Sequence, residues 1–513
     1  MLQVQNVSIT LRKDFRVILE DFNLVLNDGD KAVMIGEEGN GKSTLLKWIY
    51  DPELVEGYAD VKGVRSTGNE LLGYLPQELP AEDRNKSVYE FFSENDVFWS
   101  ETPKDLALLA KKYKVADDFF YSEQKMETLS GGEKIKAELM RLLMQEPTIL
   151  LLDEPSNDID IATLELLEEL IRERKHAVLY ISHDETLIER TANMVVHIEQ
   201  IARKTRSRYT VVHMPYREYV EDRLGRFERQ AQQAANDRKE KKARDEKYKR
   251  VLNSVDHALG TATRQNPAAA KNLKDKMHSV KSMGRRFARE DESMTEMPEM
   301  EEAIFFKLGG EKSAIPAGKT VLEFREDELI SPDGEKVLAR DIFLRVRGPE
   351  KVCIVGTNGA GKTTLLRQIA KQLLARDDIC AEYMPQNYSD LLDPTKTPVD
   401  FLNISGDKDM ETRIRTYLGS LKFTFDEMDH PMGELSGGQR AKVFLLKMSL
   451  SDANVLILDE PTRNFSPLSL PVIRQMLRNF PGAIISVSHD RKYIGDVCDT
   501  VYRLTEKCLS PDN

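Results

Sequence analysis

Two glycine-rich segments, residues 36–43 and 356–363, each end in a lysine followed by a hydroxyl residue. Glycines let the backbone approach an anion closely, and the N–H groups at the start of a helix favour negative charge. Lys42 and Lys362 supply positive charge for the β- and γ-phosphates, and the hydroxyl residues that follow supply a ligand for Mg²⁺. Both segments therefore predict a site for the phosphates of a nucleotide.

A carboxylate pair stands downstream of each loop, as Asp153-Glu154 and Asp459-Glu460. The aspartate of such a pair supports a metal ion, and the glutamate lies where it can polarise an attacking water as general base. In both copies, the serine of a Leu-Ser-Gly-Gly run precedes the aspartate by 23 residues, and a histidine follows the aspartate by 30. Matching parts in matching order indicate two copies of one hydrolytic unit.

The elements that must position these residues can be read from the flanking sequence. Residues 32–35 and 352–355 are short, β-branched apolar runs, typical of buried parallel strands, and a helical pattern begins at each lysine. Residues 149–152 and 455–458 are further buried strands that end in the carboxylates. The pattern predicts an α/β fold in which a mainly parallel sheet, covered on both faces, occurs twice.

The whole set of motifs resembles the tandem ATP-binding-cassette ATPases. The resemblance implies two P-loop ATP-binding-cassette domains, residues 1–213 and 297–513, joined by an antiparallel α-helical hairpin at 214–296, with ATP and Mg²⁺ as cofactors. In this family the Leu-Ser-Gly-Gly signature of each cassette faces the phosphate loop of the other. Site one would then join the first loop to Ser436 and Gly438, and site two would join the second loop to Ser130 and Gly132. The expected assembly is a monomer whose two cassettes dimerise within the chain.

The motifs and the resemblance together give a set of candidate site residues. The catalytic residues are Glu154, Glu460, His183 and His489. The ATP-binding residues are Phe15, Gly36, Gly39, Gly41, Lys42, Ser43, Thr44, Ser130, Gly132, Gly356, Gly359, Gly361, Lys362, Thr363, Thr364, Ser436 and Gly438. The metal-site residues are Ser43, Gln77, Asp153, Thr363, Gln386 and Asp459.

The two predicted sites differ in two respects. Phe15 is a candidate to stack on adenine, and the aligned position in the second copy is Glu335. Asp160 of the first copy is replaced by Ser466 in the second. Because both catalytic glutamates are present, we expect two competent sites with unequal rates.

The composition indicates the cellular compartment in which the protein is expected. Four cysteines among 513 residues show neither CxxC spacing nor a disulfide framework, which favours a reducing cytosol. The first residues show no signal peptide, and the longest apolar runs are far shorter than the ~20 residues that a membrane helix needs. We therefore expect a cytoplasmic protein without membrane contact; a transporter would need membrane domains from another chain.

The segment between the two copies is basic, although the chain as a whole has a net charge of −12. Residues 217–290 contain 20 Lys and Arg against 11 Asp and Glu, which is either the footprint of a nucleic-acid partner or a solvated linker. Apolar residues at helical spacing predict a first helix from Tyr216 and a second that starts at Pro267 after Asn266. We expect a turn at about Leu252 to Asn266. The hairpin either projects or packs back on a cassette, and its narrow apolar stripes favour projection.

Tandem cassettes joined by a basic hairpin resemble the ABC-F family of translation-associated ATPases. The resemblance implies a 70S ribosome partner, with the hairpin in the E site near P-site tRNA and 23S rRNA. Residues 461–467 and 276–283 further resemble the antibiotic-resistance branch, which displaces lincosamide, streptogramin A and pleuromutilin-type drugs by ribosome protection. A housekeeping ABC-F translation factor and the ATPase subunit of a multi-chain ABC transporter are the alternatives. The expected ribosome or tRNA contacts are Arg238, Lys242, Lys247, Arg250, Leu252, His257, Leu259, Arg264, Lys271 and Lys274.

Overall fold

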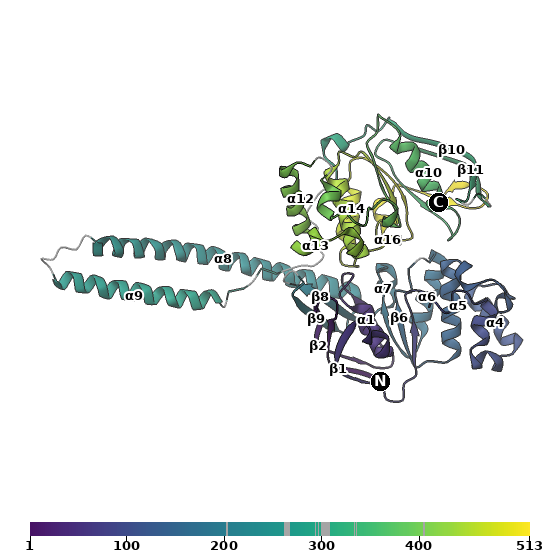
Figure 1. Ribbon diagram of the computed structural model, residues 1–513, viewed down its shortest axis with the longest axis horizontal. Helices are drawn as coiled ribbons and strands as arrows, with labels where there is room; N and C mark the ends of the chain where they lie inside the picture. Colours follow the sequence, from purple (N-terminus) through teal and green to yellow (C-terminus); the bar gives the residue numbers. More distant parts are fainter. Residues whose placement is uncertain are drawn as a thin grey trace. The chain divides into compact units, whose positions relative to one another are not determined.

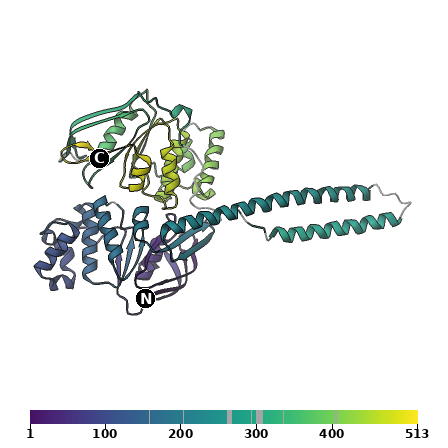
Figure 2. The same cartoon turned by 180° about the vertical axis from the view of Figure 1, so that it is seen from behind.

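The computed structural model describes residues 1–513 except 158, 202–203, 261–266, 293, 296, 299–307, 333, 335, 404–405 and 513. Met1–Tyr216 and Glu301–Asn513 form one compact unit, and Arg217–Met300 form a second. The first unit contains two α/β cassettes, and the second contains two long helices (Figure 1, with the view from behind in Figure 2). The predicted fold class is confirmed, whereas the domain boundaries at 213 and 297 stay predictions.

Cassette 1 contains the first half of the strands and helices. Its strands are β1 (Leu2–Leu11), β2 (Val17–Leu26), β3 (Lys31–Ile35), β4 (Ala59–Ser66), β5 (Leu72–Leu75), β6 (Ile149–Asp153), β7 (Ala177–Ile181), β8 (Met194–Ile201) and β9 (Arg206–Val212). Its α-helices are α1 (Lys42–Tyr50), α2 (Glu53–Glu56), α3 (Val88–Ser93), α4 (Pro103–Tyr113), α5 (Gly131–Met144), α6 (Ile161–Glu173) and α7 (Glu185–Thr191). Short 3₁₀ turns cover Asp96–Ser100, Phe119–Tyr121 and Met126–Thr128.

Cassette 2 repeats this order of elements. Its strands are β10 (Thr320–Ile330), β11 (Val337–Arg347), β12 (Lys351–Val355), β13 (Ala381–Met384), β14 (Val455–Asp459), β15 (Ala483–Val487), β16 (Thr500–Leu504) and β17 (Leu509–Pro511). Its α-helices are α10 (Lys362–Leu374), α11 (Pro398–Leu402), α12 (Lys408–Ser420), α13 (Phe425–Asp429), α14 (Gly437–Leu450), α15 (Leu470–Arg478) and α16 (Arg491–Val497). Short 3₁₀ turns cover Glu311–Ser313, Tyr388–Asp390 and Met432–Glu434.

The two main sheets have the same strand order, β5-β6-β7-β3-β8-β9 and β13-β14-β15-β12-β16-β17. All neighbours in them are parallel except the last pair of each sheet. Every residue of β6, β7, β14 and β15 is buried, which explains their continuous apolar sequences. Parallel strands end at a common edge, so the phosphate loops, the carboxylate pairs and the two predicted histidines, His183 and His489, gather there.

A separate antiparallel sheet covers the phosphate-loop helix in each cassette. In cassette 1 it has the order β2-β1-β4, and in cassette 2 it is the pair β10-β11. Phe22 of this sheet, Leu45 of α1 and Leu151 of β6 belong to one buried cluster. Cassette 2 has a matching cluster that joins β10 and β11 to α10 and the parallel sheet. The helices that begin at Lys42 and Lys362 are therefore held from both sides.

The second unit is a hairpin of α8 (Tyr216–Gly260) and α9 (Pro267–Glu292). The rings of Tyr248 and Phe287 meet edge to face at 5.8 Å, and the Arg244 guanidinium lies 4.6 Å from the Phe287 ring centre. Lys241 and Asp291 form an ion pair at 2.9 Å. Because residue numbers rise along one helix as they fall along the other, the helices are antiparallel, as predicted.

The hairpin differs from the sequence expectation near its turn. The sequence predicts a turn from about Leu252, but α8 continues to Gly260, because residues 252–260 contain no proline and keep helix-compatible side chains. Leu252, His257 and Leu259 are therefore helical. Part of the predicted apolar stripe is also exposed, including Leu224, Val251 and Met283. A pair of helices offers each helix only one partner face, so the rest of the stripe is left uncovered.

Candidate active sites

The two phosphate loops have nearly identical backbones. Gly41 (φ 87°) and Gly361 (φ 93°) precede the first residues of α1 and α10, in the left-handed region that favours glycine. Lys42 Nζ donates to the carbonyl oxygens of Gly36 at 2.8 Å and Glu37 at 2.9 Å. Lys362 Nζ makes the same two bonds within its own loop, each at 2.9 Å. Each loop is thus a closed turn that holds a buried ammonium group at the start of a helix.

Each loop lies beside a buried aspartate. Ser43 Oγ donates to Asp153 Oδ1 at 2.8 Å, and burial raises the pKa of Asp153 to about 6. Burial likewise raises the pKa of Asp459 to about 6, against the smaller effect of the neighbouring Thr363 hydroxyl, which lowers it. A buried carboxylate beside a hydroxyl group offers two oxygen ligands, which suits a hard divalent cation such as Mg²⁺.

In cassette 1 the Glu154 carboxylate is held by several polar side chains. Gln77 Nε2 donates to Glu154 Oε2 at 2.9 Å, and His183 Nε2 lies 3.5 Å from Oε1. Burial opposes ionisation of Glu154, but His183, Lys42 and Asn157 outweigh it and lower the pKa to about 2. Glu154 is therefore ionised, as a general base must be.

In cassette 2 the Glu460 carboxylate has a different environment. The backbone N–H of His489 donates to Glu460 Oε2 at 3.3 Å, and His489 Nε2 lies 3.8 Å from Oε1. Burial and the neighbouring Asp459 raise the pKa of Glu460 to about 8. Burial and the Lys362 ammonium lower the pKa of His489 to about 4. The two glutamates therefore differ in charge near neutral pH.

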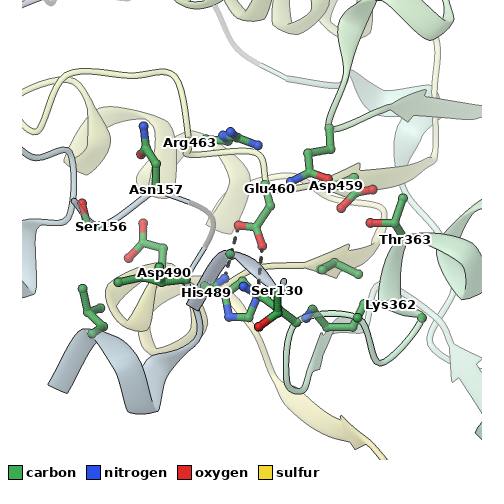
Figure 3. Close-up of a pocket in the computed structure, with 18 of the residues that line it drawn as sticks. Ser130, Ser156, Asn157, Lys362, Thr363, Asp459, Glu460, Arg463, His489 and Asp490 are labelled. Carbon is green, nitrogen blue, oxygen red and sulfur yellow. Dashed lines mark hydrogen bonds and ion pairs between the residues drawn. The ribbon is translucent and has the colours of Figure 1, made fainter. Parts of the chain in front are cut away.

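A cavity of about 710 Å³ surrounds the second phosphate loop and is lined by both cassettes. Figure 3 shows Glu460 pointing toward His489, with Ser130 of the first signature among the lining residues. Lys362, Thr363, Thr364, Gln386 and Asp459 also line this cavity, as do Gly359 and Gly361. Gly132 lines a neighbouring cavity together with Ser130 and Asn358. The structure therefore brings together the residues predicted for site two.

A smaller cavity of about 330 Å³ surrounds the first phosphate loop. It is lined by Gly39, Gly41, Lys42, Ser43, Thr44, Gln77, Glu154 and His183, together with Arg463 and Asn464 of cassette 2. Ser436 is not among the lining residues described, although Gly438 contacts the loop through Glu38. Site one is therefore narrower than site two, and the second signature meets the loop itself.

Some predicted residues are not at the cavities. The Phe15 side chain is 79% exposed and does not line the first cavity among the described residues, where Leu11, Arg16 and Ile18 stand instead. Glu335, its aligned counterpart, lies outside the described residues. Adenine stacking by Phe15 remains a prediction that this conformation does not display.

The predicted contacts on the hairpin are placed on its two helices. Arg238, Lys242, Lys247, Arg250 and His257 are exposed on α8, and Lys271 and Lys274 are exposed on α9. Leu252 and Leu259 are half-buried, and Arg264 lies outside the described residues.

Sequence reasoning missed several residues at the first cavity. Glu38, Asn157 and Arg463 line this cavity, and Asn157 bonds Glu154. Glu37, in the same loop, contacts Lys442 of the opposite cassette. A comparison of the two loops would have pointed to the two glutamates, because the first loop has Glu-Glu where the second has Thr-Asn.

The repeated phosphate loop, the buried aspartate and the signature helix from the opposite copy define a duplicated nucleotide-hydrolysing P-loop ATPase. The ABC transporter family profile matches residues 19–157 and 339–463, one segment in each cassette. The chain belongs to this family and is a tandem ATPase of the ABC-F type, an ATP hydrolase. No helix in the described ranges is long and apolar enough to cross a bilayer.

Several known proteins are similar over nearly the whole chain. Putative ATP-binding protein YdiF of Bacillus subtilis is 27% identical over 98% of this chain and 80% of its own length. ABC transporter F family member 5 of Arabidopsis thaliana is 24% identical over 97% and 75%. Energy-dependent translational throttle protein EttA of Haemophilus influenzae is 27% identical over 93% and 87%. The archaeal ribosome recycling factor aABCE1, solved with a ribosomal stalk protein, shares the fold with a TM-score of 0.59 at 17% identity, covering 99% and 90%.

Proposed function

We propose that this ATPase binds the 70S ribosome and acts on the large subunit through its hairpin. The observation that carries the proposal is the run of exposed basic side chains along α8 and α9. They include Arg238, Lys242, Lys247, Arg250, Lys271 and Lys274. Such a surface neutralises phosphates and releases counterions, which is the main source of affinity for nucleic acid. The expected neighbours are the E site, P-site tRNA and 23S rRNA.

ATP would bind at both composite sites and hold the cassettes together, and hydrolysis would release them. Ser43, Gln77 and Asp153 would hold Mg²⁺ at site one, and Thr363, Gln386 and Asp459 at site two, where the ion would neutralise phosphate charge. Lys42 and Lys362 would bind the β- and γ-phosphates. Glu154 and Glu460 would accept a proton from the attacking water, and His183 and His489 would contact the γ-phosphate.

We further propose that the cellular role is ribosome protection, in which the hairpin displaces lincosamide, streptogramin A or pleuromutilin-type drugs. The support is the resemblance of residues 461–467 and 276–283 to the resistance branch. The second candidate is a housekeeping translation factor, favoured by the similarity to a protein named as a translational throttle. Both roles share the ribosome and the ATPase cycle.

Two measurements test these proposals. An ATP-trapped protein should co-sediment with 70S ribosomes in detergent-free gradients; sedimentation with membranes instead would favour the transporter alternative. Expression in a susceptible host should raise the inhibitory concentration of at least one of the three drug classes if the role is protection. Unchanged susceptibility to all three would favour the housekeeping role.

A charge-reversal variant isolates the hairpin from the cassettes. Replacement of Lys242, Lys247, Arg250 and Lys274 by Glu should weaken ribosome binding, make it less salt-dependent, and leave ribosome-free ATPase activity nearly unchanged. The matched control changes four exposed cassette lysines, Lys104, Lys111, Lys371 and Lys408, to Glu. Equal loss of binding in both variants would show that only net charge matters and would contradict a hairpin interface.

A further inference from the structure

The first phosphate loop contains two carboxylates that the second loop lacks. Glu37 and Glu38 occupy the positions that Thr357 and Asn358 occupy in cassette 2. A carboxylate in a loop that binds a triphosphate repels the ligand, so these residues work against ATP binding unless they bind elsewhere. The structure shows where they bind, and both partners lie in the opposite cassette.

Glu37 ties the loop to cassette 2 through a buried cluster. Its Oε2 accepts from Lys442 Nζ at 2.7 Å, and its Oε1 accepts from Ser466 Oγ at 3.2 Å and Ser469 Oγ at 2.8 Å. Burial opposes ionisation of Glu37, but the Lys442 ammonium and the two hydroxyl donors together hold its pKa below the ordinary value. Lys442 lies on α14, the helix that the second signature begins. The loop and that helix are therefore fixed side by side.

Glu38 binds the signature itself. The backbone N–H of Gly438, in the first turn of α14, donates to Glu38 Oε2. A Cβ at Gly437 would lie 3.1 Å from that oxygen, and a Cβ at Gly438 would lie 2.8 Å from the Asn464 carbonyl oxygen. The two glycines of the signature therefore leave room for the Glu38 carboxylate, an anion that comes from the opposite phosphate loop.

The two sites differ in the residue at the Glu38 position and in the volume of the cavity that this residue lines. Asn358, the counterpart of Glu38, lines the open cavity of about 710 Å³, beside Ser130 of the first signature. Glu38 lines the cavity of about 330 Å³. The site with the smaller cavity is therefore also the site whose loop has a carboxylate bonded to the opposite signature.

We propose that the Glu38 carboxylate is an internal competitor of the ATP γ-phosphate at site one. In the absence of ATP it occupies the Gly438 N–H and joins the cassettes, and ATP must displace it to engage the second signature. ADP has no γ-phosphate and does not compete for this group. Glu38 thereby makes site one bind ATP more weakly than an otherwise equal site, and Glu37 holds the loop in place. The inference rests on the composite ATP sites proposed above and is independent of the ribosome.

The test measures nucleotide affinity at site one in the full chain with site two disabled by Lys362→Ala. Glu38→Asn installs the residue of the second loop, and Glu38→Gln keeps the shape without the charge. Both should tighten binding of a non-hydrolysable ATP analogue about tenfold, the scale expected for a lost hydrogen bond to a charged group, and change ADP affinity by less than about twofold.

Two further variants control for packing. Glu37→Gln disturbs the Lys442 ion pair without removing the Gly438 contact, so it should change the affinities for ATP analogue and ADP by equal factors. The mirror change Asn358→Glu, in a Lys42→Ala background, should weaken ATP-analogue binding at site two. Equal effects of Glu38→Asn on the two nucleotides, or no effect, would overturn the competitor role alone. Absence of nucleotide binding at site one in every variant would overturn the composite site as well.

Discussion

His183 of cassette 1 bonds the backbone of cassette 2, with Nδ1 at 2.7 Å from the carbonyl oxygen of Phe465. A carbonyl oxygen only accepts hydrogen bonds, so Nδ1 carries the proton and donates. The other ring nitrogen lies 3.5 Å from Glu154 Oε1. One imidazole therefore links the proposed base of site one to the loop that follows β14 in the opposite cassette.

This link predicts that His183 couples closure of the cassettes to hydrolysis at site one. In a Glu460→Gln background, His183→Ala should lower ATP turnover by ~10²-fold, the scale for loss of one preorganised polar group. His176→Ala serves as the control, because the His176 side chain is half exposed and its ion-pair partner is Asp28, which lies outside both phosphate loops. Turnover unchanged by His183→Ala would contradict the coupling.

Replacement of both glutamates tests their role as general bases. Glu154→Gln combined with Glu460→Gln leaves the phosphate loops and the metal-site residues intact, so ATP should still bind. Loss of a general base costs ~10²–10⁴ in rate, so the protein should stay closed and remain on ribosomes. Phosphate release measures turnover, and sedimentation measures ribosome binding. Turnover at the parental rate in the double variant would show that these residues are not the bases.

The two sites should differ in pH dependence. A general base works only when ionised, and Glu460 has a pKa of about 8, whereas Glu154 has a pKa of about 2. With Glu154→Gln, which leaves site two active, kcat/KM should rise as pH increases through about 8, because kcat/KM reports ionisation in the free enzyme. With Glu460→Gln, the profile should lack this rise. Identical profiles would contradict the difference between the two environments.

The sequence predicts the fold class well because each phosphate loop and its flanking elements are local in the chain. Strand, glycine loop and helix are adjacent in the chain, and the parallel sheet brings the strand ends to one edge. Contacts between cassettes were harder to predict, since Glu37 and Lys442 are 405 residues apart and depend on how two surfaces meet. The extent of α8 was also missed, because small and polar residues such as Ser254 and Asn253 weaken a helical pattern without ending the helix.

A buried carboxyl group in the first signature helix gives a stability prediction. Burial and the nearby Asp83 raise the pKa of Glu138 on α5 to about 8, from an ordinary value of 4.5. Between these values the folded protein keeps a proton that the unfolded chain releases, so the free energy of unfolding should fall as pH rises, by at most ~1.4 kcal/mol per pH unit. Glu138→Gln should flatten this slope in urea unfolding between pH 5 and 9 and stabilise the protein by ~2 kcal/mol at the alkaline end. An unchanged slope would assign the pH dependence to other groups.

Arg463 lines both cavities, and its position in cassette 1 is taken by Asn157. Its positive charge lowers the pKa of Glu460, against the larger effects of burial and Asp459. Replacement by the residue of the other cassette, Arg463→Asn, removes this charge and should raise the pKa of Glu460 further. In the Glu154→Gln background, the rise of kcat/KM should therefore move to higher pH, while Arg463→Lys, which keeps the charge, should leave it near its original position. A shift of the same size in both variants would indicate that the shape of the guanidinium, rather than its charge, sets the environment of Glu460.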